Sequence, residues 1–311
     1  MDGLWVNSHE KILTLRIFPG SFLAMLWFWL TLFCALSVAL SDLFLKISRM
    51  SSSPLIMAAV RGLLTFPFLV VLIPWFHLPH FSPQLILTLA IALPIEITAT
   101  VLYFHSIRSS PLSLSVPHLA FTPVLVLLTG WILMGERGSG LGIFGVCIVV
   151  LGGYILHLGN GEGFLAPIKS LAYEPGARSM LLVALLYSLT SVFSKKLVLL
   201  MDSVTYVVIY SGLENLGLLV VSAIMDYKKL LASIKPDRRL LASAFFIGAS
   251  TLLHAKAITM VKVAYFIATK RTSLIFCVLL GWLLLKEKQG GRRFLASIIM
   301  VGGIILIVFS K

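Results

Sequence analysis

Ten apolar runs, each close to the length of a membrane-spanning helix, constrain this chain more than any other feature. A helix needs about 20 mostly apolar residues to cross the hydrocarbon core of a bilayer, and its backbone must be satisfied within the segment. We therefore predict an all-α integral membrane protein with ten transmembrane helices. The runs are Phe22–Leu45, Leu55–Phe76, Leu85–Ile107, Leu112–Met134, Leu141–His157, Met180–Leu200, Val204–Met225, Leu240–Met260, Val263–Leu285 and Phe294–Phe309.

Composition supports this fold class and argues against the binding of nucleic acid, metals or other cofactors. The 311 residues are 59% hydrophobic and only 12% charged, whereas soluble proteins are about 25% charged. The net charge of +13 comes mostly from Lys and Arg between the apolar runs, where lipid headgroups are their usual partners. We therefore expect membrane lipids and no nucleic acid as partners. The three cysteines lie in separate runs without metal-ligand spacing, so we expect no metal and no other cofactor.

The longest break between runs divides the chain into halves. Residues 158–179 lie at mid-chain and are rich in glycine and proline. We predict a tail at 1–21, a five-helix unit at 22–157, a linker at 158–179 and a second five-helix unit at 180–309. The tail lacks the apolar core and small-residue cleavage site of a signal peptide.

The two units are copies of one another. Gly130-Trp131 followed by Glu136 recurs 151 positions later as Gly281-Trp282 followed by Glu287, and Lys46 matches Lys196 at an offset of 150. An ordered series of such matches indicates duplication. Because five is odd, the second unit must enter the membrane with the opposite orientation. Inverted repeats are a transporter architecture, with the substrate site near the midplane between the units.

Adjacent cations in the ninth run are the sharpest candidate site. A charged residue at the bilayer centre costs roughly 2.5–3.5 kcal/mol and persists mainly where it faces a cavity or a partner. Lys270 and Arg271 lie midway along Val263–Leu285. We favour an anion site, since Arg forks onto carboxylate or phosphate and Lys adds a point charge. The alternative is a buried pair with Glu96 or Glu214, which would neutralise the cations or carry a proton.

For several further residues the sequence leaves two interpretations open, namely lining a cavity or a purely structural role. Lys195 and Lys196 either line a cavity or anchor a helix end in headgroups, and His118 and His254 either line a cavity or pack. Arg61 is interpreted as structural. The predicted substrate-binding set is Lys270, Arg271, Lys195, Lys196, His118, His254, Tyr265 and Tyr103, with Glu96 and Glu214 as charge-balancing or proton-carrying residues.

The sequence resembles the drug/metabolite transporter superfamily in its tandem EamA form. The resemblance covers residues 22–309 and rests on the two units of five spans, on Arg61 in the second span, and on the paired Gly-Trp…Glu motifs. It implies a transporter rather than an enzyme, and no catalytic motif is recognisable. It also implies cytoplasmic termini. The distribution of Lys and Arg places both termini outside, so both orientations remain open.

A narrower similarity concerns the phosphate-binding motifs of the triose-phosphate translocator branch. Phe193-Ser194-Lys195-Lys196 and Lys270-Arg271 look like the basic motifs of its sixth and ninth helices. The resemblance implies that Lys195 or Lys196, with Lys270 and Arg271, would hold a phosphate.

These observations predict a secondary transporter of a small anionic metabolite, with phosphorylated substrates included. It would work through a central cavity and run on a substrate or ion gradient. Two alternatives are an exporter of amino acids or other neutral or cationic metabolites, and a membrane enzyme or lipid-headgroup-handling protein. The expected location is the bacterial plasma membrane, and a homodimer is one candidate assembly.

Overall fold

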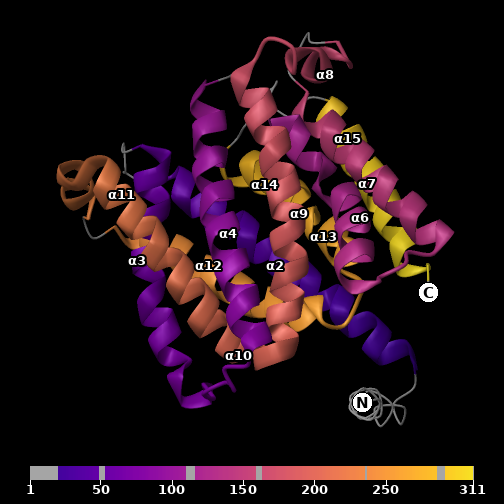
Figure 1. Ribbon diagram of the computed structural model, residues 1–311. Helices are drawn as coiled ribbons and strands as arrows, with labels where there is room; N and C mark the ends of the chain where they lie inside the picture. Colours follow the sequence, from indigo (N-terminus) through magenta and orange to yellow (C-terminus); the bar gives the residue numbers. More distant parts are fainter. Residues whose placement is uncertain are drawn as a thin grey trace.

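The computed structural model describes residues 20–48, 53–109, 116–158, 163–234, 237–285 and 291–310, which form helices and no strand. The predicted tail as far as residue 19, the start of the fourth predicted span and Glu287 lie outside these residues. Figure 1 shows the helices as one bundle, with the start of α2 and the end of α15 at the same lower end. An even number of spans requires that placement.

The first unit contains five helical segments that follow the predicted spans. The fourth begins as a 3₁₀ segment, η2, and continues as α6. A short 3₁₀ turn, η1 (Ile73–Trp75), follows the second segment. The segments are α2 (Gly20–Lys46), α3 (Pro54–Val71), α4 (Pro83–Ser109), η2 (Val116–Phe121) with α6 (Thr122–Met134), and α7 (Gly140–His157).

The second unit repeats this order after the short linker helix α8 (Ala166–Ser170). Its second segment is continuous through a π-helical turn, η3, and bends at Asp226, whose φ of −162° is not helical. The segments are α9 (Pro175–Met201), α10 (Ser203–Tyr206) with η3 (Val207–Ser211) and α11 (Gly212–Ser233), α12 (Arg238–Ile258), α13 (Val263–Lys270) with α14 (Thr272–Leu285), and α15 (Gly291–Val308).

Length and hydropathy agree with ten spans. Six segments of the described chain are long and apolar enough to cross a membrane, and four shorter apolar helices complete the set. Large apolar side chains on the outer surface are exposed, among them Trp29, Phe144 and Ile224, the last at 80%. Such surface is costly in water and favourable in lipid. The chain is therefore a multi-pass integral membrane protein of the predicted fold class.

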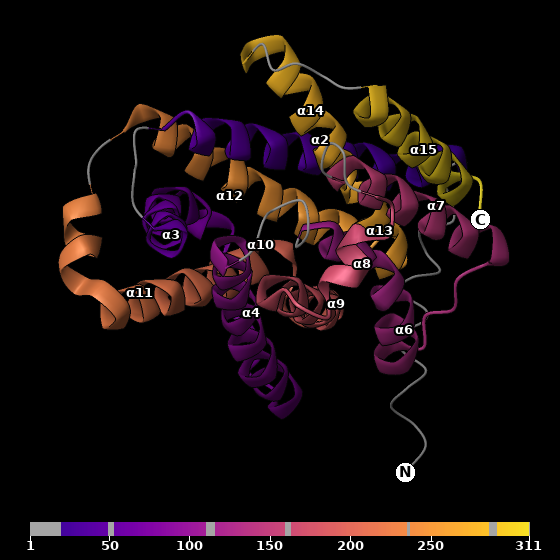
Figure 2. The same cartoon turned by 90° about the horizontal axis from the view of Figure 1, so that it is seen from above.

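The helix pairs obey the symmetry of an inverted repeat. The first helix of each unit packs against the third helix of the other, α2 on α12 and α9 on α4. The second helices, α3 and α11, pack on each other, as do the fifth helices, α7 and α15. Figure 2 shows these pairs side by side. Exchanging the two units leaves the pattern unchanged.

Glycine allows the closest of these contacts. A Cβ added to Gly145 of α7 would lie 2.7 Å from the carbonyl oxygen of Gly303 on α15, and the reverse distance is also 2.7 Å. Small residues let membrane helices approach in this way. Gly145 and Gly303 therefore serve packing.

The fourth and ninth spans are interrupted at equivalent places. The change from η2 to α6 falls between Phe121 and Thr122, and α13 and α14 are separated at Arg271. Thr122 and Ser273 are 151 positions apart, which is the repeat offset. Pro123 accounts for the first interruption, and no proline lies near the second. Interrupted helices at membrane depth are typical of transporter binding sites.

Candidate functional site

A central cavity lies between the two repeats and has two adjoining parts. The larger part, about 400 Å³, reaches the break between α13 and α14. The smaller part, about 270 Å³, lies among α3, α4, α11 and α12. The side chains of Glu96, Tyr187, Ser211, Glu214 and Thr251 border both parts. Both repeats therefore contribute to one polar space.

Lys270 and Arg271 line the larger part. Lys270 Nζ lies 3.1 Å from His254 Nδ1, and Arg271 Nη2 donates to the Leu119 carbonyl oxygen at 3.4 Å. Arg271 Nε is buried and has no hydrogen-bond partner among the described residues. Within the described part of the chain, neither cation forms an ion pair within 4.0 Å. The structure thus differs from the alternative of a direct pair with Glu96 or Glu214.

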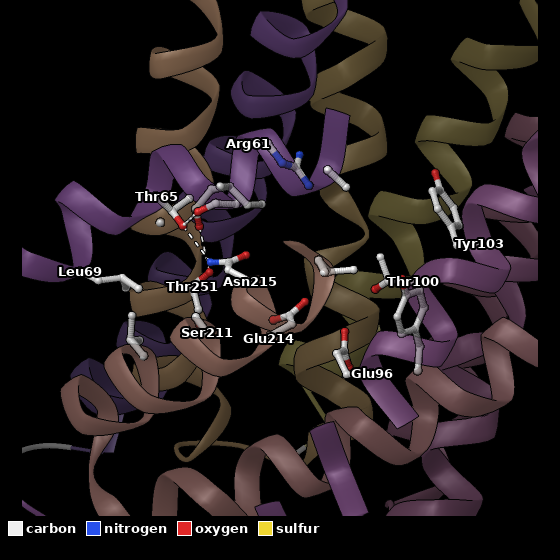
Figure 3. A pocket seen from close by; sticks show the side chains of 17 residues that line it. Arg61, Thr65, Leu69, Glu96, Thr100, Tyr103, Ser211, Glu214, Asn215 and Thr251 are labelled. Carbon is white, nitrogen blue, oxygen red and sulfur yellow. Dashed lines mark hydrogen bonds between the residues drawn. The ribbon is translucent and has the colours of Figure 1, made fainter. Parts of the chain in front are cut away.

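The acidic side chains border the same space. Figure 3 shows the carboxyl groups of Glu96 and Glu214 pointing toward one another, with Arg61 across the smaller part. Tyr103 also lines this part. Arg61 was interpreted as structural, yet it faces the cavity from α3. Nearby, Asn215 donates to Thr65 Oγ1 at 2.8 Å and joins α11 to α3.

A chain of hydrogen bonds runs from Lys270 into the wall of the cavity. His254 Nε2 lies 3.1 Å from Ser194 Oγ, and Ser194 Oγ lies 2.7 Å from the Tyr206 hydroxyl. Tyr206 stacks on Tyr210 at 5.1 Å between ring centroids. Together these contacts connect α13, α12, α9, α10 and η3 around the larger part.

Four of the predicted binding residues do not line either part. Lys196 and His118 are absent from both linings, and His118 is only 1% exposed. Tyr265 instead accepts a hydrogen bond from the Ser139 amide at 2.9 Å. It fills the space beside Gly142, where a Cβ would meet its hydroxyl. Tyr265 therefore joins α13 to the start of α7.

Lys195, the fourth, is engaged by a carboxylate. Its Nζ lies 2.5 Å from Glu136 Oε1 and donates to the Val261 carbonyl oxygen at 2.7 Å. Glu136 Oε2 accepts from the Val263 amide at 2.7 Å. Lys195 is 8% exposed. The contacts tie the end of α6 and the start of α13 to α9. The positive charge of Lys195 is therefore balanced by Glu136 within the protein.

The family model of the EamA-like transporters matches twice, at residues 24–158 and 175–309. The chain belongs to the EamA-like transporter family. This EamA protein is therefore a membrane transporter of the drug/metabolite type, and the resemblance drawn from its Gly-Trp…Glu motifs is confirmed at that level. The narrower similarity to the triose-phosphate translocator branch stays a prediction.

Comparison with other proteins adds the fold. A solved structure titled only as a crystal structure of a protein matches with a TM-score of 0.68. The match covers 93% of this chain and 98% of the other at 15% identity. At that identity the likeness shows the fold alone. No protein of curated function matches the sequence.

Several residues that shape the EamA cavity had no distinctive sequence signal. Ser194, Tyr206 and Tyr210 line its larger part, but single hydroxyl groups in apolar runs are common. Glu136 was noted only as part of a repeated motif. Its pairing with Lys195 follows from the meeting of three segments, which the spacing of residues along one helix does not reveal.

Proposed function

We propose that this transporter carries a small anionic metabolite and that Lys270 and Arg271 bind the anion. The observation that carries the proposal is the pair of adjacent cations on the cavity wall without an ion pair in the described chain. Family membership indicates transport activity, and the two cations indicate that the transported molecule is negatively charged.

Hydrogen-bond capacity supports an anion as the ligand. A lysine ammonium has three donors and an arginine guanidinium has five. Lys270 uses one donor toward His254 and Arg271 uses one toward Leu119. The remaining donors suit a carboxylate or a phosphate, and the guanidinium fork suits either one. A bound anion would also offset the cost of holding two cations at membrane depth.

The volume supports a small cargo. Ligand sites for small molecules usually occupy about 300–1,000 Å³, and the larger part measures about 400 Å³. Polar groups converge on it from both repeats, which suits a site that opens alternately to the two sides.

Flux through proteoliposomes tests the proposal. Lys270→Gln/Arg271→Gln should abolish the uptake of whichever labelled probe enters with the unchanged protein: inorganic phosphate, glycerol 3-phosphate or succinate. Lys256→Gln is the matched control, because Lys256 is exposed near the end of α12 and does not line the cavity. Unchanged uptake by the double variant would remove these two residues from the site.

A zwitterionic or cationic cargo is the second candidate, because Glu96 and Glu214 border the cavity and offer partners for an ammonium group. Thermal-shift measurements distinguish the candidates, since a ligand stabilises the protein that binds it. Stabilisation by amino acids that is lost in Glu96→Gln, without stabilisation by the three anions, would favour this candidate.

A further inference from the structure

The contact between Lys270 and His254 fixes the position of one proton. Their nitrogen atoms lie 3.1 Å apart, a hydrogen-bonding distance. An ammonium group has only donors, so His254 Nδ1 must accept. The imidazole is therefore neutral and carries its hydrogen on Nε2, from which it can donate to Ser194 Oγ at 3.1 Å. A second proton on Nδ1 would displace this hydrogen bond and place two positive charges in contact.

An anion bound at Lys270 would change both the hydrogen bonding and the electrostatic surroundings of His254. The anion binds the remaining donors of Lys270, and its charge draws the ammonium group away from Nδ1, which loses its donor. Its negative charge also favours a positive charge on the imidazole beside it. Anion binding and proton binding then strengthen each other, and thermodynamic linkage makes the effect equal in both directions.

We propose that His254 takes up a proton when the anion binds and that the transporter moves the two together. The inference rests on the proposed anion site at Lys270. The proton comes from water on the side where the cavity is open and bonds to Nδ1, while the hydrogen on Nε2 stays with Ser194. After reorientation, the anion leaves, Lys270 returns to Nδ1 and the proton passes to water on the other side. No bond within the cargo changes.

Other ionisable groups surround this pair and are alternative proton carriers. The Phe266 and His254 rings pack in a T-shaped arrangement with their centroids 4.8 Å apart, and His254 also lines the larger part of the cavity. Ionisable residues are contributed by every element near it. They are Cys34 of α2, Arg61 of α3, Glu96 of α4, Tyr187 of α9, Tyr206 of α10, Tyr210 of η3, Glu214 of α11, Lys270 of α13 and Arg271 beyond it.

Uptake under an imposed pH gradient tests the inference. Proteoliposomes are made alkaline inside while the outer pH is held constant, so the ionisation of the external probe does not change. The membrane potential is clamped with potassium and valinomycin. The probes are labelled inorganic phosphate, glycerol 3-phosphate and succinate. One proton per monoanion predicts about tenfold greater accumulation for each unit of pH difference, because one pH unit is a tenfold ratio.

His254→Gln separates proton coupling from transport. Glutamine can still accept a hydrogen bond from Lys270 but cannot take up the proton. We expect this variant to exchange labelled for unlabelled probe across the membrane and to ignore the pH gradient. His105→Gln is the matched control, because His105 is exposed on α4 away from the cavity lining. It should respond to the gradient like the unchanged protein.

The outcomes are distinct. A pH-driven response that survives in His254→Gln would overturn the inference and assign the proton to another group, such as Glu96 or Glu214. Uptake by the unchanged protein that ignores the gradient would overturn it without any variant. No uptake of any probe by the unchanged protein would overturn the proposed function and, with it, this inference.

Discussion

Lys195 and the Lys270–Arg271 pair carry the same sign of charge, yet their surroundings are opposite. Lys195 contacts a carboxylate and a carbonyl oxygen and is 8% exposed. Lys270 and Arg271 line a cavity, and neither has an ion pair within the described chain. The comparison teaches that the partners of a cation, rather than its sign, separate a structural contact from a candidate binding site.

The difference begins in how each cation is positioned. Glu136 follows Gly135, whose φ of 68° ends α6 in a left-handed turn and directs the chain toward α9 and α13. Its carboxylate also meets the amino end of α13, where the helix dipole favours negative charge. Lys270 and Arg271 instead lie where α13 gives way to α14, on a cavity that Glu96 and Glu214 also border, and within the described chain no carboxylate lies within 4.0 Å of either cation.

Removing Lys195, the partner of Glu136, should give the largest difference in stability between the two clusters of cations. Lys195→Met should destabilise the protein by up to about 3 kcal/mol, because it leaves a partly buried carboxylate without its counter-charge. Lys270→Met should lower stability much less, since it removes a cation that has no ion pair within the described residues. Thermal unfolding in detergent measures both.

Lys256→Met controls for the loss of a positive charge as such, because Lys256 is exposed. In the double variant Glu136→Gln/Lys195→Met much of the stability should return, because the uncompensated charge is gone. Equal destabilisation by Lys195→Met and Lys270→Met would refute the distinction between the two clusters.

Arg271→Lys should have the next largest effect, and on binding rather than on stability. The substitution keeps the charge but removes the planar fork that holds a carboxylate or phosphate through two bonds. We expect the affinity for the transported probe to fall roughly tenfold, corresponding to about 1.4 kcal/mol. Binding titration measures the affinity, and an unchanged unfolding midpoint verifies the fold. Full affinity with lysine at this position would exclude two-bond recognition.

The ten spans, the repeat and the position of Lys270 and Arg271 on a cavity could be predicted from the sequence more readily than which neighbouring residues face that cavity. Hydropathy and repeat offsets are read along the chain, and they determine spans and depth. The rotation of each helix is set by packing. On α9 the four-residue spacing of Tyr187, Ser191 and Lys195 favours one shared face, but the cavity lining ends with Ser194. One residue is about 100° of rotation on a helix, which is enough to turn Lys195 toward Glu136.

The interruption at Arg271 is a second feature that could not be predicted from local sequence. Pro117 and Pro123 mark the break in the fourth span, whereas its counterpart in the ninth span has no such signal. There the backbone closes with a hydrogen bond from the Arg271 amide to the Ala268 carbonyl oxygen at 3.1 Å. The repeat offset was the available clue, since it aligns Ala120 with Arg271.

Ser194→Ala should have the smallest effect on the affinity for the transported probe. This variant tests whether the two clusters are connected, because Ser194 and Lys195 are neighbours on α9. The alanine removes the hydroxyl that contacts His254 Nε2 and the Tyr206 hydroxyl. One such hydrogen bond contributes about 0.5–1.5 kcal/mol, so we expect a threefold to tenfold loss of affinity for the transported probe, as well as a weaker response to the pH gradient. Thr190→Ser tests whether any change in this polar wall has that effect, because it keeps a hydroxyl that also lines the cavity. If Ser194→Ala changed only the unfolding midpoint, Ser194 would belong with the structural contacts of Lys195 rather than with the site at Lys270.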